Sequence, residues 1–143
     1  MALTVLTIDD DTAITELFSI LLRTYGFEVL TANSSKEGIQ LVREKSPRLV
    51  LLDLIMPGMN GWEVCKAIRS FSNVPIIILS ALDDPRMVAS ALDAGADDYL
   101  VKPVPSSVLI AHMKKLIRRT GGFTAAPEAT VSLAKPGTQL LGR

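Results

Sequence analysis

The sequence has few cysteines and few aromatic residues, and it has no excess of charge of either sign. Cys65 is the one cysteine among 143 residues, so no internal disulfide can form, which fits a reducing compartment. Aromatic residues make up only 5% of the chain, so its core has to be aliphatic. Lys plus Arg and Asp plus Glu both number 15, which leaves no net positive charge for phosphate contacts. We therefore expect no direct nucleic-acid binding by this domain.

Long apolar runs and a secretion signal are also missing. No apolar run approaches the roughly 18 residues of a membrane helix. The first residues, Met1–Ile8, lack a basic flank and lead directly into three aspartates, unlike a signal peptide. We expect a cytoplasmic protein with no membrane association. What the chain does have, 48% hydrophobic and 21% charged residues, is typical of one packed domain.

Short apolar runs alternate with amphipathic stretches along the chain. Strands are expected at Leu3–Ile8, Phe27–Leu30, Leu49–Leu52, Pro75–Leu79 and Tyr99–Val101. Helices are expected at Ala13–Tyr25, Ser35–Glu44, Gly61–Phe71, Arg86–Ala94 and Ser106–Arg119. This alternation predicts an α/β fold, a doubly wound five-stranded parallel sheet with helices on both faces. We predict a domain over residues 1–119, and a flexible tail or truncated interdomain linker rich in small residues over 120–143.

Polar residues directly follow four of the five expected strands. Asp9 and Asp10 follow the first strand and Asp53 the third, while Ser80 follows the fourth and Lys102 the fifth. In open parallel sheets, ligands bind beyond the carboxyl ends of the strands, where these residues would meet. The loop expected after the second strand, 31–33, contributes no charge.

Three carboxylates at one edge repel one another, so the cluster favours a divalent cation or raised pKa values. Oxygen ligands suit magnesium, which also binds phosphoryl oxygens. Asp53 is a carboxylate nucleophile of the kind that forms an aspartyl phosphate, with Lys102 and Ser80 available to its oxygens. An aspartate after a strand can also be only a helix cap, and Asp11 is expected to be one.

Four segments carry a resemblance to the receiver domain of bacterial response regulators. They are Ile8–Asp11, Leu52–Gly61, Pro75–Ala81 and Gly95–Pro103, and the resemblance covers about residues 3–119. It implies a flavodoxin-like fold with strand order 2-1-3-4-5. It also implies a two-component phosphoprotein in signal transduction rather than an enzyme.

The resemblance assigns roles at the strand ends. Asp53 matches the phosphoacceptor, which receives its phosphoryl group from a sensor histidine kinase or a phosphotransfer protein. Asp9 and Asp10, with Asp53 and the backbone carbonyl of Ile55, match the residues that hold Mg²⁺ or Mn²⁺.

Three further positions match the residues that respond to the phosphoryl group. Ser80 and Lys102 match the residues that contact it, and the Lys102–Pro103 peptide matches one that is typically cis. Ser80 and Tyr99 match the switch pair that alters the face formed by helix 4, strand 5 and helix 5. That face would control an output domain or protein partner. Ile55 and Leu82 flank the phosphoryl position with apolar side chains, so we expect slow autodephosphorylation.

Other readings of the sequence stay open. Val88, Val108 and His112 stand where a Lys, a Glu and an Arg are usual in relatives with a winged-helix DNA-binding domain, and this departure argues against their mode of dimerisation. We expect a monomer or a phosphorylation-dependent dimer. One alternative is a receiver-like interaction module that is never phosphorylated. Another is a magnesium-dependent phosphatase, although such enzymes use a second acid where Ile55 stands. The cognate kinase and pathway cannot be named from the sequence.

Overall fold

The computed structural model describes residues 2–120, in which five strands alternate with five helices. The strands are β1 (Thr4–Ile8), β2 (Glu28–Ala32), β3 (Leu49–Asp53), β4 (Ile76–Ser80) and β5 (Asp98–Val101). The helices are α1 (Thr12–Thr24), α2 (Ser35–Lys45), α3 (Gly61–Arg69), α4 (Pro85–Asp93) and α5 (Ser106–Arg119). The α/β class is confirmed. The predicted tail at 120–143 lies outside the described residues except for Thr120.

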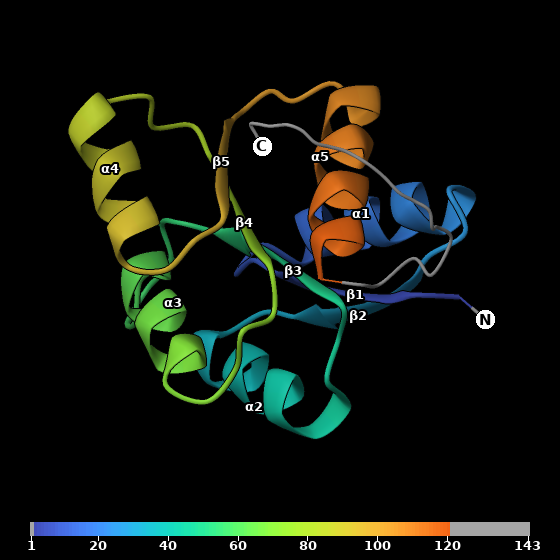
Figure 1. Ribbon diagram of the computed structural model, residues 1–143, viewed down its shortest axis with the longest axis horizontal. Helices are drawn as coiled ribbons and strands as arrows, with labels where there is room; N and C mark the ends of the chain where they lie inside the picture. The colour runs from blue at the N-terminus through green and yellow to red at the C-terminus, as the bar shows by residue number, and fades with distance from the viewer. Residues whose placement is uncertain (1, 121–143) are drawn as a thin grey trace.

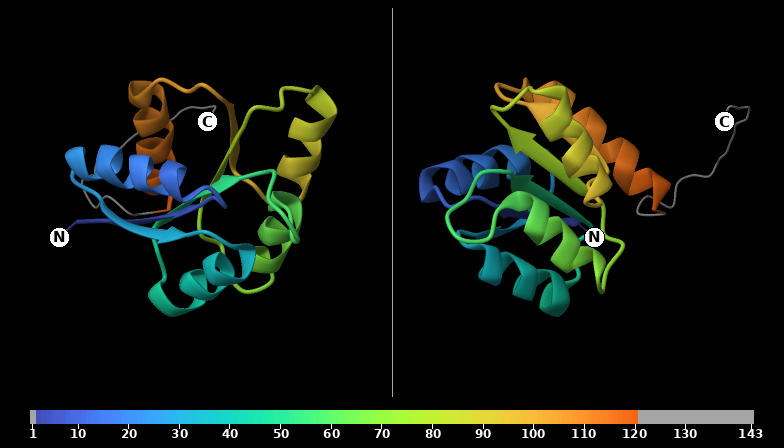
Figure 2. Two further views of the ribbon diagram at one scale, coloured as in Figure 1. Left: turned by 180° about the vertical axis from the view of Figure 1, so that it is seen from behind. Right: turned by 90° about the vertical axis from the view of Figure 1, so that its left-hand side faces the viewer.

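The five strands form one parallel sheet in the order β2-β1-β3-β4-β5. This confirms the flavodoxin-like order that the resemblance implied. Helices α1 and α5 cover one face of the sheet, and α2, α3 and α4 cover the other (Figures 1 and 2). Because all strands run in the same direction, their carboxyl ends meet at one edge, where the predicted site residues follow them.

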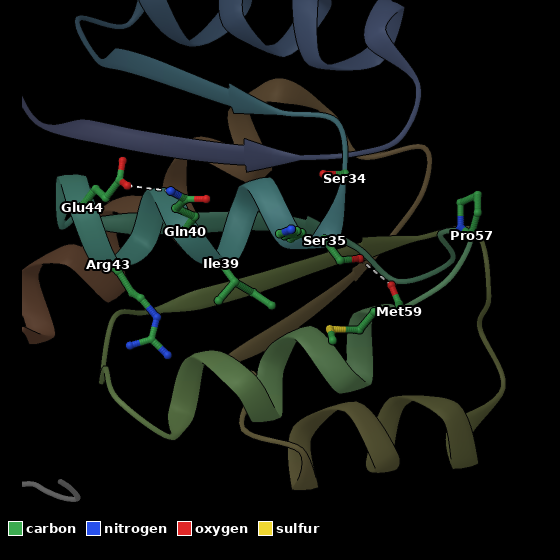
Figure 3. Close-up of a pocket in the computed structure, with 9 residues that line it drawn as sticks. Ser34, Ser35, Ile39, Gln40, Arg43, Glu44, Pro57 and Met59 are labelled. Carbon is green, nitrogen blue, oxygen red and sulfur yellow. Dashed lines mark hydrogen bonds between the residues drawn. The ribbon is translucent and has the colours of Figure 1, made fainter.

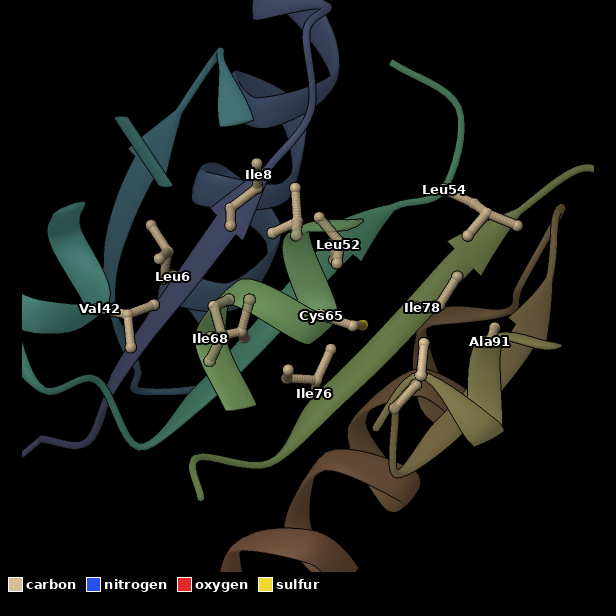
Figure 4. Close-up of a cluster of buried hydrophobic side chains, with 14 of the residues drawn as sticks. Leu6, Ile8, Val42, Leu52, Leu54, Cys65, Ile68, Ile76, Ile78 and Ala91 are labelled. Carbon is tan, nitrogen blue, oxygen red and sulfur yellow. The ribbon is translucent and has the colours of Figure 1, made fainter. Parts of the chain in front are cut away.

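Two clusters of aliphatic side chains hold the sheet between its helix layers. Neighbouring strand residues point to opposite faces, so Val5 packs beneath α1 and α5 whereas Leu6 packs against the layer of α2, α3 and α4. Figure 4 shows this second cluster, where Cys65 and Ile68 of α3 and Ala91 of α4 lie against the strands. The central strands β3 and β4 are buried on both faces, which explains their unbroken aliphatic sequences.

Cys65 is fully buried in the second cluster. Burial raises the pKa of this thiol to about 11. The thiolate, which is the reactive form of cysteine, is therefore scarce at neutral pH. The thiol acts as a small apolar side chain in the core.

The second strand is longer than the sequence pattern predicts. Thr31 and Ala32 pair with Thr7 and Ile8 of β1, so β2 ends at Ala32 and the predicted loop at 31–33 begins only at Asn33. Thr31 favours a strand and Ala32 does not, and pairing with β1 carries the strand through both residues. Within residues 2–120, no helix is both long and apolar enough to cross a bilayer.

Candidate functional site

Strand register brings the predicted site residues together at the carboxyl edge of the sheet. Ile8 pairs with Leu52, so the residues that follow them, Asp9 and Asp53, stand side by side at the ends of β1 and β3. The next pairings place Ser80 at the end of β4 and Lys102 directly after β5. The Lys102 amide donates a hydrogen bond of 2.8 Å to the Ser80 carbonyl, which holds these two strand ends against each other.

Three carboxylates and one ammonium form the centre of the site. One oxygen from each of Asp9, Asp10 and Asp53 lies within 4.8 Å of the others. The Lys102 Nζ lies 3.7 Å from Asp53 Oδ1 and 3.8 Å from Asp9 Oδ2. Lys102 thus contacts two of the three acids and leaves an excess of negative charge at the site.

Two of these acids hold their protons more strongly than an ordinary aspartate does. Burial raises the pKa of the Asp53 carboxyl above 3.8, Asp9 raises it further, and Lys102 and the Ile55 backbone amide partly oppose the rise. Burial likewise raises the pKa of Asp9, opposed by the amide of Asp11 and by Lys102. Both shifts have the same origin, since the folded protein removes water from negative charges that it neutralises only in part.

This donor set fits a hard divalent cation. Three carboxylate oxygens in close proximity are the ligands that magnesium and manganese prefer. Asp9 is buried and Asp53 half-buried, whereas Asp10 is exposed, so the cluster is open to solvent on one side. An ion there could keep water molecules, as magnesium usually does.

The neighbouring Asp11 is part of the frame of the site. Its side chain accepts from the Ala13 amide at 2.9 Å and caps α1, as predicted. Its own amide donates to Asp9 Oδ1 at 2.9 Å. The first turn of α1 therefore orients the Asp9 carboxylate while the Asp11 side chain starts the helix.

The loop after Asp53 is fixed by the start of α3 and by α2. The Gly61 amide donates to the Leu54 carbonyl at 2.8 Å, and a Cβ at Gly61 would lie only 2.7 Å from the Leu54 Cα. On the other side, the Ser35 hydroxyl donates to the Met59 carbonyl (Figure 3). These two contacts fix the path of the backbone around Ile55, whose side chain is 54% exposed.

A groove of about 720 Å³ lies beside α2, and Figure 3 shows the residues that line it. Ile39 and Arg43 line it from α2, and Pro57 and Met59 line it from the loop after β3. None of the acids of the site lines this groove. Among the described residues, the groove is therefore separate from the charged cluster.

The two predicted switch residues both bind the backbone of Leu82. The Ser80 hydroxyl accepts from the Leu82 amide at 3.1 Å, and the Tyr99 hydroxyl donates to the Leu82 carbonyl at 2.7 Å. Ser80 is buried, and the Tyr99 ring is half-buried against the cluster beneath α3 and α4. The Lys102–Pro103 peptide bond is cis, as the resemblance implied.

Sequence reasoning missed two polar contacts near the site. Asn33, in the loop that was expected to add no charge, donates to the Asp9 carbonyl at 2.9 Å. His112 is partly exposed on α5, and its Nδ1 contacts Asp98 of β5. Neither partner is close in sequence, so no local motif indicates these contacts.

Comparison with known proteins agrees with this geometry. The sequence model described as the response regulator receiver domain matches residues 5–114. The chain is 42% identical over 115 residues to the DNA-binding response regulator MtrA of Mycobacterium tuberculosis, covering 80% of this chain and 50% of that protein. It is 44% identical over 114 residues to the transcriptional regulatory protein AfsQ1 of Streptomyces coelicolor, covering 80% and 51%. The chain thus spans about half the length of these curated relatives.

Solved structures give the same result. A two-component response regulator from Clostridium difficile aligns with a TM-score of 0.79 at 29% identity, covering 82% of this chain and 98% of that one. The chemotaxis protein CheY4 of Vibrio cholerae aligns with a TM-score of 0.75 at 28% identity, covering 81% and 99%. From the family match and these relatives, the chain belongs to the response regulator receiver domain family of two-component signal transduction.

Proposed function

We propose that Asp53 accepts a phosphoryl group and that the Asp9–Asp10–Asp53 cluster binds Mg²⁺ to permit this reaction. The observation that carries the proposal is the convergence of three carboxylates and the Lys102 ammonium at the ends of β1, β3 and β5. Asp9, Asp10 and Asp53 would hold the ion with the backbone carbonyl of Ile55, and Mn²⁺ suits the same oxygens. A bound ion would neutralise the charge that develops on the phosphoryl oxygens.

The transfer is a displacement at phosphorus. A carboxylate oxygen of Asp53 attacks the phosphorus of a phosphohistidine on a sensor histidine kinase or a phosphotransfer protein. A P–O bond forms and the P–N bond breaks, and the imidazole nitrogen leaves with the electron pair and takes a proton from solvent. Lys102 lies 3.7 Å from Asp53 and can bind a phosphoryl oxygen as a point charge.

The contacts of Leu82 suggest how phosphorylation reaches the surface of the protein. The Ser80 hydroxyl accepts from the Leu82 amide, so its own hydrogen is available to a phosphoryl oxygen. A move of Ser80 toward Asp53 would release the Leu82 amide, while Tyr99 still binds the Leu82 carbonyl. The β4–α4 loop would then shift and change the face formed by α4, β5 and α5, which would act on an output domain or protein partner.

That face has an apolar character in this chain. Met87 and Leu92 of α4, Val101 of β5 and Val108 of α5 are all exposed. A phosphorylation-dependent dimer through this surface would therefore rest on apolar contacts more than on ion pairs. Light scattering before and after phosphorylation measures the molecular mass in solution and tests for this dimer. A mass that does not change on phosphorylation would mean that the face contacts other partners and not a second copy of the chain.

Intact-mass spectrometry tests the proposed function. The protein is incubated with acetyl phosphate and Mg²⁺, and Asp53→Asn serves as the matched variant because it keeps the shape of the side chain. We expect one phosphoryl adduct on the parent protein and none on the variant. A parent that forms no adduct at any Mg²⁺ concentration would support the non-phosphorylated interaction module. Sustained hydrolysis of phosphate esters would support a phosphatase.

Persistence of the phosphoryl group is a second expectation. Ile55 and Leu82 carry no side-chain hydrogen-bonding group, so neither can orient a water molecule for attack on phosphorus. We expect the adduct to persist for minutes or longer after acetyl phosphate is removed, and Ile55→Asn to shorten its lifetime. Loss within seconds from the parent protein would contradict this reasoning.

A further inference from the structure

Asn33 connects three segments at the edge of the acidic cluster. It directly follows β2, and its side-chain amide lies between the β1–α1 loop and the first turns of α1. The Nδ2 group donates to the Asp9 carbonyl at 2.9 Å and to the Thr15 hydroxyl at 3.0 Å. Both amide hydrogens of Asn33 are therefore used, one on each segment.

The bond to Asp9 acts on the peptide group that joins Asp9 to Asp10. A peptide group is planar, so a hydrogen bond that holds the Asp9 carbonyl also fixes the orientation of the Asp10 amide in the same plane. The Asp9 amide donates to the Ala32 carbonyl at 3.1 Å, so the Asp9 backbone is held to the end of β2 from both sides. The directions of both neighbouring carboxylates depend on this anchorage.

Asn33 is itself held in place. Its backbone amide donates to the Glu37 Oε1 at 2.9 Å, while the Ser34 side chain accepts from the Glu37 amide and caps α2. The Thr15 hydroxyl that receives the second bond is buried and donates to the Thr12 carbonyl at 3.1 Å. The Asn33 side chain thus links the start of α2 to the start of α1, and hydrogen bonds hold the groups at both ends of this link in place.

We propose that Asn33 is a positioning residue that sets the geometry of the Asp9–Asp10 pair for cation binding. This inference rests on the proposed function, since it assigns Asn33 a part in the same magnesium site. The Asn33 nitrogen donates to Asp9 and Thr15, and neither bond involves the metal directly. Asn33 acts through Asp9, in the way that groups behind metal ligands commonly orient them.

The test measures Mg²⁺ affinity by calorimetry in the full chain and its variants. Asn33→Ala removes both hydrogen bonds, and we expect the dissociation constant for Mg²⁺ to rise by about 10-fold or more. Thr15→Ala leaves the bond to Asp9 in place, so we expect a smaller rise, and Thr15→Ser should restore the parent affinity.

Two control variants separate positioning from general loss of stability. Gln40→Ala removes an exposed amide on α2 that, within residues 2–120, bonds only to Glu44, and it should leave the affinity unchanged. Ile117→Val loosens the core on the α1–α5 face away from the site, so it lowers the melting temperature without moving the Mg²⁺ affinity. A merely structural role for Asn33 would make Asn33→Ala behave like Ile117→Val.

The outcomes separate this inference from the proposed function. Suppose that the parent protein binds Mg²⁺ and forms the acetyl phosphate adduct. An Asn33→Ala variant whose Mg²⁺ dissociation constant then lies within twofold of the parent's overturns this inference and leaves the proposed function intact. A parent protein that does not bind Mg²⁺ overturns both. A rise of about 10-fold in the Mg²⁺ dissociation constant of Asn33→Ala, with the Mg²⁺ affinity of both control variants equal to the parent's, supports the assignment.

Discussion

Replacing Asp53 by Asn should make the metal-free protein more stable at neutral pH, although it removes the proposed phosphoacceptor. Asp53 is half-buried, and its ionised form is opposed first by loss of water and then by Asp9. One Asp9 oxygen lies within 4.8 Å of an Asp53 oxygen, so at an effective dielectric constant of 20 the two carboxylates repel each other by about 3.5 kcal/mol or more. Lys102 at 3.7 Å attracts it by about 4.5 kcal/mol before screening by the solvent that reaches this lysine.

These two charge interactions nearly cancel, so the desolvation of the carboxylate decides the sign. A buried charge costs several kcal/mol, and we expect about 1–2 kcal/mol for this half-buried group. Asn fills the same volume without the charge. The free energy of unfolding of Asp53→Asn should therefore exceed that of the parent by about 1–2 kcal/mol at pH 7 without metal.

The pH dependence follows from the raised pKa of Asp53. Below the ordinary value of 3.8, the carboxyl is protonated in both the folded and the unfolded protein, and the variant has no advantage. As the pH rises through the higher pKa of the folded state, the parent loses stability relative to the variant. The difference should be small near pH 3.8 and fully developed at neutral pH.

Urea denaturation across this pH range measures the effect. Glu16→Gln, which removes an exposed carboxylate from α1, is the matched control and should change stability by less than about 0.5 kcal/mol. An Asp53→Asn variant that is less stable than the parent at pH 7, or a gain that persists unchanged at pH 3.8, would refute the reasoning.

Three further predictions concern the metal, the loop after Asp53 and the buried thiol. Mg²⁺ at 100 times its dissociation constant should raise the free energy of unfolding by about 2.7 kcal/mol in urea titrations, and no shift would mean that the cluster binds no metal. This gain should fall as the pH is lowered, because protons compete for Asp9 and Asp53, whose pKa values are raised. Gly61→Ala should cost about 1–3 kcal/mol, since its Cβ would meet the Leu54 backbone at 2.7 Å, and a denaturation midpoint equal to the parent's would show that the loop adapts. The Cys65 thiol, with a pKa of about 11, should resist alkylation in the folded protein, and rapid labelling at neutral pH would contradict its burial.

The sequence allowed the fold to be predicted where burial imposes a strong pattern. β3 and β4 are buried on both faces, so their aliphatic runs mark them clearly. β2 lies at the edge of the sheet, and its apolar and polar residues alternate less regularly. Its last two residues become part of the strand only through pairing with β1. Pairing between distant segments leaves no mark in a short window of sequence, so the end of β2 was predicted wrongly.

The residues of the candidate site could also be predicted only in part from the sequence. Charged groups after strands are visible in the sequence, because a rule of the fold says where the strand ends meet. Asn33 and Asp9 are joined by an amide–carbonyl bond across 24 positions, and an uncharged asparagine in a loop gives no sign of its partner. The contact between His112 and Asp98 is of the same kind, since it depends on the packing of α5 against β5. Such contacts follow from the folded arrangement alone.

The most direct test of the central claim is to locate the phosphoryl group on the chain. The protein is phosphorylated with acetyl phosphate and Mg²⁺, reduced with borohydride to convert an aspartyl phosphate into homoserine, and digested for peptide mass spectrometry. We predict homoserine at position 53, at the end of β3, and at no other aspartate. Homoserine at Asp9 or Asp10 instead, or none at all in a protein that binds Mg²⁺, would contradict the account.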